Sequence, residues 1–77
     1  MDNERKAQAL GQVAGTIKWF DRKKGFGFVK LEDGRDAFVH YSNVMDVDSN
    51  TLAEGQPVTA SLYQGHRGLF LRKLQVT

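Results

Sequence analysis

Two short stretches decide how this chain folds. Residues 24–29 read Lys-Gly-Phe-Gly-Phe-Val, and residues 36–40 read Asp-Ala-Phe-Val-His. Because alternate side chains of a strand share one face, each stretch carries large rings on one face and glycine or small aliphatic residues on the other. The segment between them contains Asp-Gly, a hairpin signal, so we predict that the two strands are neighbours.

The face of this hairpin that carries the aromatic rings has two interpretations. In the first, Phe26, Phe28 and Phe38 form the core, since phenylalanine is usually buried. In the second, the rings face solvent, where the flat faces of nucleobases stack on them. His40 shares the ringed face, the opposite face carries no polar side chain, and lysines 18, 23, 24 and 30 lie close in sequence. These features favour the second interpretation, although the pattern alone leaves both open.

The first strand contains the single tryptophan, Trp19. By alternation it shares a side with Ile17, while Lys18 and Phe20 share the other. A lone tryptophan is more often in the core than at a contact surface, but a kink in a long first strand of a barrel would turn it outward. The alternation rule leaves its direction open.

Short runs of β-branched and aromatic residues continue along the chain, separated by glycine-bearing turns. We expect strands near residues 13–21, 25–31, 36–41, 57–64 and 68–76. In the longer connection, Ser42 and Asn43 are expected to cap one helical turn over Val44 and Met45. Five short antiparallel strands and no long helical pattern predict an all-β protein that closes into a small barrel, because closure removes exposed edges.

Length and composition restrict the class of protein. The chain has 77 residues, enough for one small domain. It contains no cysteine, which excludes disulfides and thiolate chemistry. No stretch approaches the ~20 apolar residues of a membrane span, and the polar start does not resemble a secretory signal. We expect a cytoplasmic protein with no membrane partner.

The charge is segregated along the chain rather than large. Residues 1–30 carry a net charge of +4, residues 31–54 carry −5, and residues 55–77 carry +3, which sum to the net +2 of the chain. A folded chain with this distribution can present one positive face, and such a face attracts polyphosphate.

Catalytic and metal-binding patterns are weak. Asp36, His40 and Ser42 are the residue types of a hydrolytic triad, but no nucleophile elbow or oxyanion loop accompanies them. His40 and His66 lack metal-ligand spacing. We therefore expect no enzyme activity, no metal and no cofactor.

Several motifs then occur in order with matching spacing: Gly-Thr-Ile-Lys-Trp-Phe-Asp over 15–21, the two stretches quoted first, Leu-x-Glu-Gly-Gln-x-Val over 52–58 and Gly-x-Arg-Gly over 65–68. Together they resemble the cold-shock domain of small bacterial cold-shock proteins. The resemblance implies a five-stranded antiparallel OB-type β-barrel that binds single-stranded RNA or DNA as a monomer. It also implies RNA-chaperone action that affects transcription or translation.

The resemblance implies a set of nucleic-acid-binding residues and decides that the rings face outward. The stacking residues are Trp19, Phe26, Phe28, Phe38, His40 and Tyr41, and the family positions around them are Lys18, Lys24 and Asp36. The alternative is a β-barrel protein-interaction module that uses the same exposed rings.

The chain departs from the family pattern at three places. The family usually has an aromatic residue in the loop after the third strand. In this chain that position lies near Ser49, within an acidic run. Phe70 replaces a smaller residue in the last strand, either as a core residue, which we favour, or as an added stacking group. Residues 1–12 are expected to form a flexible tail, so that the cold-shock-like domain spans 13–77.

Overall fold

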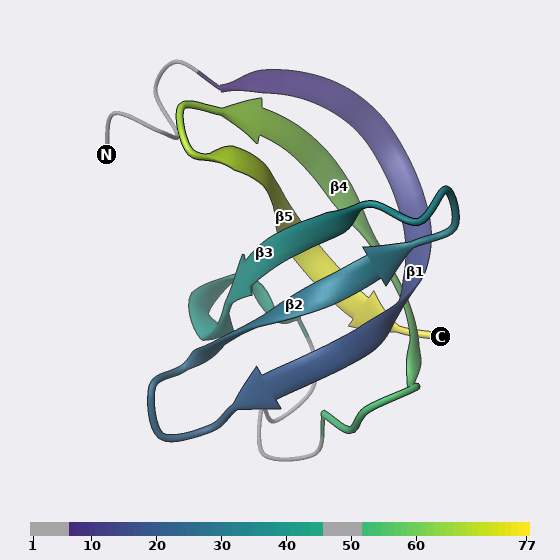
Figure 1. Cartoon of the computed structure of the whole chain (residues 1–77), viewed down its shortest axis with the longest axis vertical. Coiled ribbons are helices and arrows are strands. Elements are labelled where there is room, and N and C mark those ends of the chain that lie inside the picture. The colour runs from purple at the N-terminus through teal and green to yellow at the C-terminus, as the bar shows by residue number, and fades with distance from the viewer. Residues whose placement is uncertain (1–6, 46–51) are drawn as a thin grey trace.

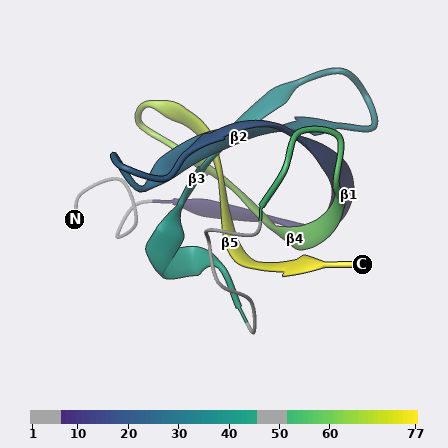
Figure 2. The same cartoon turned by 90° about the horizontal axis from the view of Figure 1, so that it is seen from below.

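One long curved strand, β1 (Gln8–Asp21), pairs with two different strands along its length (Figure 1). This computed structural model describes residues 7–45 and 52–77. The described part also contains β2 (Phe26–Leu31), β3 (Asp36–His40), β4 (Pro57–Gly65) and β5 (Gly68–Val76). The second half of β1 pairs with β2 and the first half with β4. The strands close into a barrel in the order β1-β2-β3-β5-β4, which Figure 2 shows from below.

The predicted all-β, five-stranded barrel is confirmed, with one difference in strand direction. β3 and β5 run parallel, with Phe38 and Phe70 as Cα partners, whereas the other pairings are antiparallel. The direction follows from the number of antiparallel pairings on each side of the barrel. β3 is two antiparallel steps from β1, and β5 is also two antiparallel steps from β1, by way of β4. The strands that close the barrel must therefore point the same way.

β1 begins earlier than the sequence predicts. Residues 8–12, which the sequence pattern places in a tail, pair with β4 from Gln8 opposite Gln64 to Gln12 opposite Ser61. These five residues are all exposed, so backbone pairing rather than side-chain burial places them, and apolar patterning could not reveal it. The rest of the predicted tail, residues 1–6, lies outside the described residues, and its flexibility stays a prediction.

The barrel interior is filled by aliphatic side chains. Its contiguous core consists of Ile17, Val29, Leu31, Ala37, Val39, Leu52, Val58, Ala60, Leu62, Leu71 and Leu74. Burial of this apolar surface is the main favourable term for a domain of this size. Within the described residues, no buried side-chain nitrogen or oxygen lacks a hydrogen-bond partner. Because aliphatic side chains fill the interior, the core needs no aromatic ring from the β2–β3 hairpin.

A β-bulge at Lys18 sets the direction of Trp19. Ile17 pairs with Val29, but Trp19 pairs with Phe28, so β1 contains one residue more than β2 at this point. The extra residue shifts the alternation. As a result Ile17 is only 1% exposed, whereas Trp19 is 41% exposed.

The segment before β4 supports this bulge. The backbone N–H of Ile17 donates to the carbonyl of Gln56 at 2.9 Å, and the N–H of Gly55 donates to the carbonyl of Ile17 at 2.7 Å. The side-chain oxygen of Gln56 also accepts from the N–H of Ala53 at 3.2 Å. The Glu-Gly-Gln motif thus has a structural role, because it satisfies the backbone groups of β1 beside the bulge.

Gly27 lets β1 approach β2 next to the bulge. A Cβ atom at this position would lie 2.7 Å from the Cα of Phe20 and 2.8 Å from its ring, and would overlap the carbonyl oxygen of Trp19. Backbone atoms cannot move away as freely as the end of a flexible side chain. The glycine between the two rings of Phe-Gly-Phe is therefore required by sheet geometry.

We expect Gly27→Ala to lower the free energy of unfolding by about 1–3 kcal/mol, because the added methyl group collides with the backbone of β1. Urea unfolding followed by the fluorescence of Trp19 measures this change. Gln75→Ala, at an exposed position of β5, is the control and should stay within about 0.5 kcal/mol of the wild type. Equal stability of the two variants would contradict the close approach.

The predicted helical turn after β3 is wrong in position. A 3₁₀ turn, η1, spans Tyr41–Asn43, earlier than the expected Val44 and Met45. Its cap is His40, whose Nδ1 accepts from the backbone N–H of Ser42 at 3.3 Å. The sequence favoured hydroxyl and amide caps, whereas an imidazole acceptor at the end of β3 performs this role.

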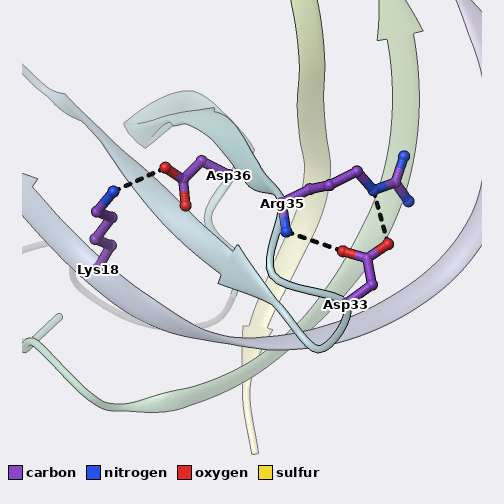
Figure 3. A network of polar contacts seen from close by, with 4 residues as sticks. All are labelled: Lys18, Asp33, Arg35 and Asp36. Carbon is purple, nitrogen blue, oxygen red and sulfur yellow. Dashed lines mark hydrogen bonds and ion pairs between the residues drawn. The ribbon is translucent and has the colours of Figure 1, made fainter.

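Two exposed ion pairs lie at the start of β3 and in the turn before it (Figure 3). The backbone N–H of Arg35 donates to the carboxylate of Asp33 at 3.0 Å, and its Nε donates at 2.7 Å. These bonds, the backbone one foremost, lower the pKa of Asp33 from its usual value. Lys18 Nζ lies 2.7 Å from Asp36 Oδ2. Because all four side chains are exposed, these pairs contribute little to stability.

Candidate functional site

The β2–β3 hairpin presents its rings to solvent and its aliphatic side chains to the core. Val29 is 1% exposed, and Ala37 and Val39 are fully buried. On the other face Phe26, Phe28, Phe38 and His40 are all half-buried. The interpretation in which the phenylalanine rings form the core is therefore excluded, and the outward-facing one is confirmed.

Six rings form what we call the aromatic platform: Trp19, Phe26, Phe28, Phe38, His40 and Tyr41. The centroid of Trp19 lies 5.9 Å from that of Phe26 and 5.4 Å from that of Phe28. Phe38 lies 5.6 Å from Phe26 and 5.8 Å from Phe28. Edge and tilted contacts of this kind stabilise aromatic pairs. They hold four rings in place while leaving ring surface open to solvent.

His40 and Tyr41 form the end of the platform beside the β1–β2 turn. Their ring centroids are 4.6 Å apart, and Tyr41 is 56% exposed. His40 Nδ1 lies 2.8 Å from the hydroxyl of Ser42, which fixes the imidazole plane. The backbone N–H of Tyr41 donates to the carbonyl of Gly25 at 2.8 Å. A Cβ at Gly25 would lie 2.7 Å from the Tyr41 ring, so glycine is needed there.

Lysines that neighbour the platform residues in sequence differ in their partners. In the β1–β2 turn, the carboxylate of Asp21 accepts from the backbone N–H groups of Lys23 and Lys24 at 3.0 and 3.1 Å. Both lysine side chains are exposed. Lys18 is paired with Asp36, with side-chain exposures of 50% and 39%. Lys18 can readily exchange Asp36 for another anion, because both side chains are open to water and the ion pair is weak.

A groove of about 510 Å³ continues the platform beyond Phe28 and Phe38. Its lining also includes Asp36, Arg67, Leu69 and Phe70. Arg67 was not among the predicted site residues, and only its basic character in a glycine-rich turn could have indicated it. A second hollow of about 510 Å³ is lined by Glu32, Asp33 and Arg35, so its charged side chains have a net negative charge. In the first groove the charges of Asp36 and Arg67 balance. The first groove is the one that suits an anionic chain.

Phe70 is buried, as the favoured interpretation required, but it does not join the aliphatic core. It is 6% exposed, yet it is absent from the contiguous core cluster. Its neighbours include Phe38, its Cα partner across β3 and β5, and the stacked ring of Tyr63. Its burial agrees with the core interpretation that we favour, although its ring packs beside the aliphatic cluster rather than within it. The position near Ser49, where an aromatic residue was expected to be missing, lies outside the described residues.

The hydrolytic residue types do not assemble into a triad. His40 does contact the hydroxyl of Ser42, but the carboxylate of Asp36 is engaged by Lys18. The described residues include no group of three or more His, Cys, Asp or Glu side chains able to hold a metal ion. Over 7–45 and 52–77, no helix has the length and apolar character needed to cross a membrane.

A closed five-stranded barrel with rings on its outer wall is the architecture of the OB-type domains that bind nucleic acid. The family model described as the 'Cold-shock' DNA-binding domain matches residues 13–75, and the chain belongs to this family. The predicted function class, a nucleic-acid-binding protein of the cold-shock type, is thereby confirmed. The family is not one of enzymes.

Individual relatives agree with this assignment. Over 54 residues, or 70% of this chain, the identity is 54% to Cold shock protein 2 of Lactiplantibacillus plantarum, and the match covers 82% of that protein. Over the same share of this chain, the identity is 44% to Cold shock protein CspB of Bacillus caldolyticus, again with 82% covered. The solved structure of Drosophila Unr CSD456 has a TM-score of 0.70 over 86% of this chain and 26% of that chain. At 24% identity it supports the fold alone.

The two faces of the hairpin should differ in their effect on stability. We expect Phe28→Ala to lower the free energy of unfolding by about 1–2 kcal/mol, since it removes ring contacts on the outer wall without opening a cavity in the core. Ile17→Ala should cost about 2–5 kcal/mol, because it opens a cavity in the core. Thermal unfolding of both variants measures the difference. A larger loss for Phe28→Ala than for Ile17→Ala would contradict the outward-facing platform.

Proposed function

We propose that this protein binds single-stranded RNA or DNA on the aromatic platform, with low sequence specificity. The observation that carries the proposal is the outward direction of the rings on a wall whose other face is the core. Each nucleobase has a flat π-face, and stacking on a protein ring contributes ~1–3 kcal/mol per base. Apolar ring surface that gathers on one face and is open to water supports a binding role.

The platform suits unpaired strands better than duplexes. In a duplex the faces of each base are covered by the neighbouring bases, and only base edges are open to a protein. Phe26, Phe28 and Phe38 offer flat surfaces to base faces. A strand with free bases can lie across them, whereas a duplex cannot without being unstacked. This preference arises from shape and requires no particular base.

The charged side chains near the platform have separate roles. Lys24, projecting from the turn that Asp21 holds, attracts phosphates near the His40 and Tyr41 end of the platform. Lys18 does so beside Trp19 once it leaves its ion pair. The carboxylate of Asp36, at the groove, then becomes an acceptor for an amino or imino group of a base. Release of counterions from the strand makes such binding depend on salt.

We further propose that the protein acts as an RNA chaperone, as a monomer in the cytoplasm. A protein that binds only the unpaired state of an RNA hairpin shifts the equilibrium toward that state by mass action. No catalytic group and no cofactor is needed for this effect. Opening a hairpin in this way would alter transcription or translation.

Phe26→Ala and Phe28→Ala are each expected to weaken binding of a short single-stranded oligonucleotide by ~1–3 kcal/mol, because each removes one stacking surface. Quenching of Trp19 fluorescence during titration measures the affinity. Leu10→Ala removes a side chain that is 43% exposed on β1, outside the platform, and serves as the control with unchanged affinity. Unchanged affinity in both phenylalanine variants would refute the platform as the binding site.

The same titration at two salt concentrations separates the proposal from its alternative. The logarithm of the affinity should fall with the logarithm of salt concentration, with a slope of about −0.7 per phosphate contacted. Failure to bind oligonucleotide at low salt would favour a protein partner for the exposed rings.

Chaperone action predicts that the protein opens a stem-loop RNA labelled with a fluorophore and a quencher. Fluorescence should rise with protein concentration, without ATP, and reverse when an unlabelled single strand is added as competitor. Phe26→Ala should shift the rise to higher protein concentration by the factor that it costs in binding. A stem-loop that stays closed at protein concentrations that saturate the single strand would exclude chaperone action while leaving single-strand binding intact.

A further inference from the structure

A second aromatic cluster lies outside the platform, on the β4–β5 hairpin. The rings of Tyr63 and Phe70 are stacked, with centroids 5.4 Å apart and an angle of 15° between their planes. The guanidinium carbon of Arg72 lies 5.6 Å from the centroid of Tyr63. We call these three residues the β4–β5 plate. Contacts with a parallel ring and with a cation hold the tyrosine in a defined orientation.

The plate is on the outside of the barrel. Leu62 and Leu71 are partners in the β4–β5 ladder, and both point into the core, with exposures of 2% and 1%. The next pair along the ladder is Tyr63 and Phe70, which must point the other way. Tyr63 is half-buried, so part of its surface is open to solvent. Phe70 is its backing and has little exposed surface of its own.

The plate is continuous with the platform. Phe70 is the Cα partner of Phe38, the platform ring nearest to β5, and side chains of paired residues share a face. The groove of about 510 Å³ is lined by both of these residues and by Phe28 and Arg67. A chain that crosses Phe28 and Phe38 therefore leads through this groove toward β5 and the plate.

We propose that the β4–β5 plate is an additional nucleotide site for the same single strand, an inference that rests on the proposed function. The occupant is one nucleotide that has left the platform through the groove. Its base lies against Tyr63 and the planar guanidinium of Arg72, since guanidinium groups stack on rings and attract phosphate. Phe70 is a positioning residue that holds Tyr63. The charge agrees with this occupant, because residues 55–77 contain three basic side chains and no acidic one.

The plate extends the strand length that the protein can hold, and this gives a direct test. Oligothymidylates that lengthen one nucleotide at a time are titrated against the full chain, with quenching of Trp19 as the readout. For the wild type, affinity should rise until the platform is covered and then rise once more, by roughly fivefold to tenfold, when one nucleotide reaches the plate.

Tyr63→Leu and Arg72→Gln should each abolish this last increase and leave the affinity for shorter oligonucleotides unchanged. Tyr63→Phe keeps the ring and should retain the increase. Lys73→Gln removes the same charge as Arg72→Gln from the next residue of β5, which is exposed, and is the matched control. Thermal unfolding of each variant confirms that it is folded, and Arg72→Gln provides the test if Tyr63→Leu is not.

Each outcome decides between the two proposals. Retention of the increase in both Tyr63→Leu and Arg72→Gln would overturn the plate as a site, with the platform unaffected. An equal loss in Lys73→Gln and Arg72→Gln would also overturn it, because the effect would then come from overall charge. Absence of binding by the wild type at every length would refute the proposed function, and the additional site with it.

Discussion

The interior of a five-stranded barrel is filled here by valine, leucine, isoleucine and alanine, and this packing constraint determines the outer surface. Once Val29, Ala37 and Val39 occupy the inside of the β2–β3 hairpin, alternation places Phe26, Phe28 and Phe38 outside. Exposure of these rings is therefore a consequence of how the core is packed. The same strands stabilise the fold with one face and present the binding surface with the other.

The position of Trp19 shows how distant segments contribute to this surface. The bulge that turns Trp19 outward depends on Gly27, which lets β1 and β2 approach closely, and on Gly55 and Gln56, which satisfy the backbone of Ile17. None of these three residues belongs to the platform. Their effect is to place the indole within 6 Å of two phenylalanine rings, as the centroid distances of 5.9 and 5.4 Å show. Motifs that look like binding signatures thus include residues whose role is to shape the backbone.

Departures from the family pattern carry information that the shared motifs do not. A phenylalanine at position 70 is an ordinary residue type for a core. Its ring nevertheless stacks on Tyr63 beside the aliphatic cluster and lines the groove next to Phe38. Arg72 adds a planar cation to the same stack. If a nucleotide occupies this plate, the strand that the protein holds extends beyond the platform, while the chemistry of stacking is the same on both surfaces.

The amino-acid sequence alone predicts which hairpin side chains share a face, the five strands and the lack of a long helix, because these depend on period-two alternation and on turn residues. It does not reveal which hairpin face points outward, the direction of Trp19, the pairing of residues 8–12, the parallel closure of β3 on β5 or the surroundings of Phe70. Each of these depends on contacts between residues far apart in the chain, such as Ile17 with Gln56 or Phe38 with Phe70. Alternation along one strand cannot reveal a bulge or a closing partner, since both exist only when the sheet closes.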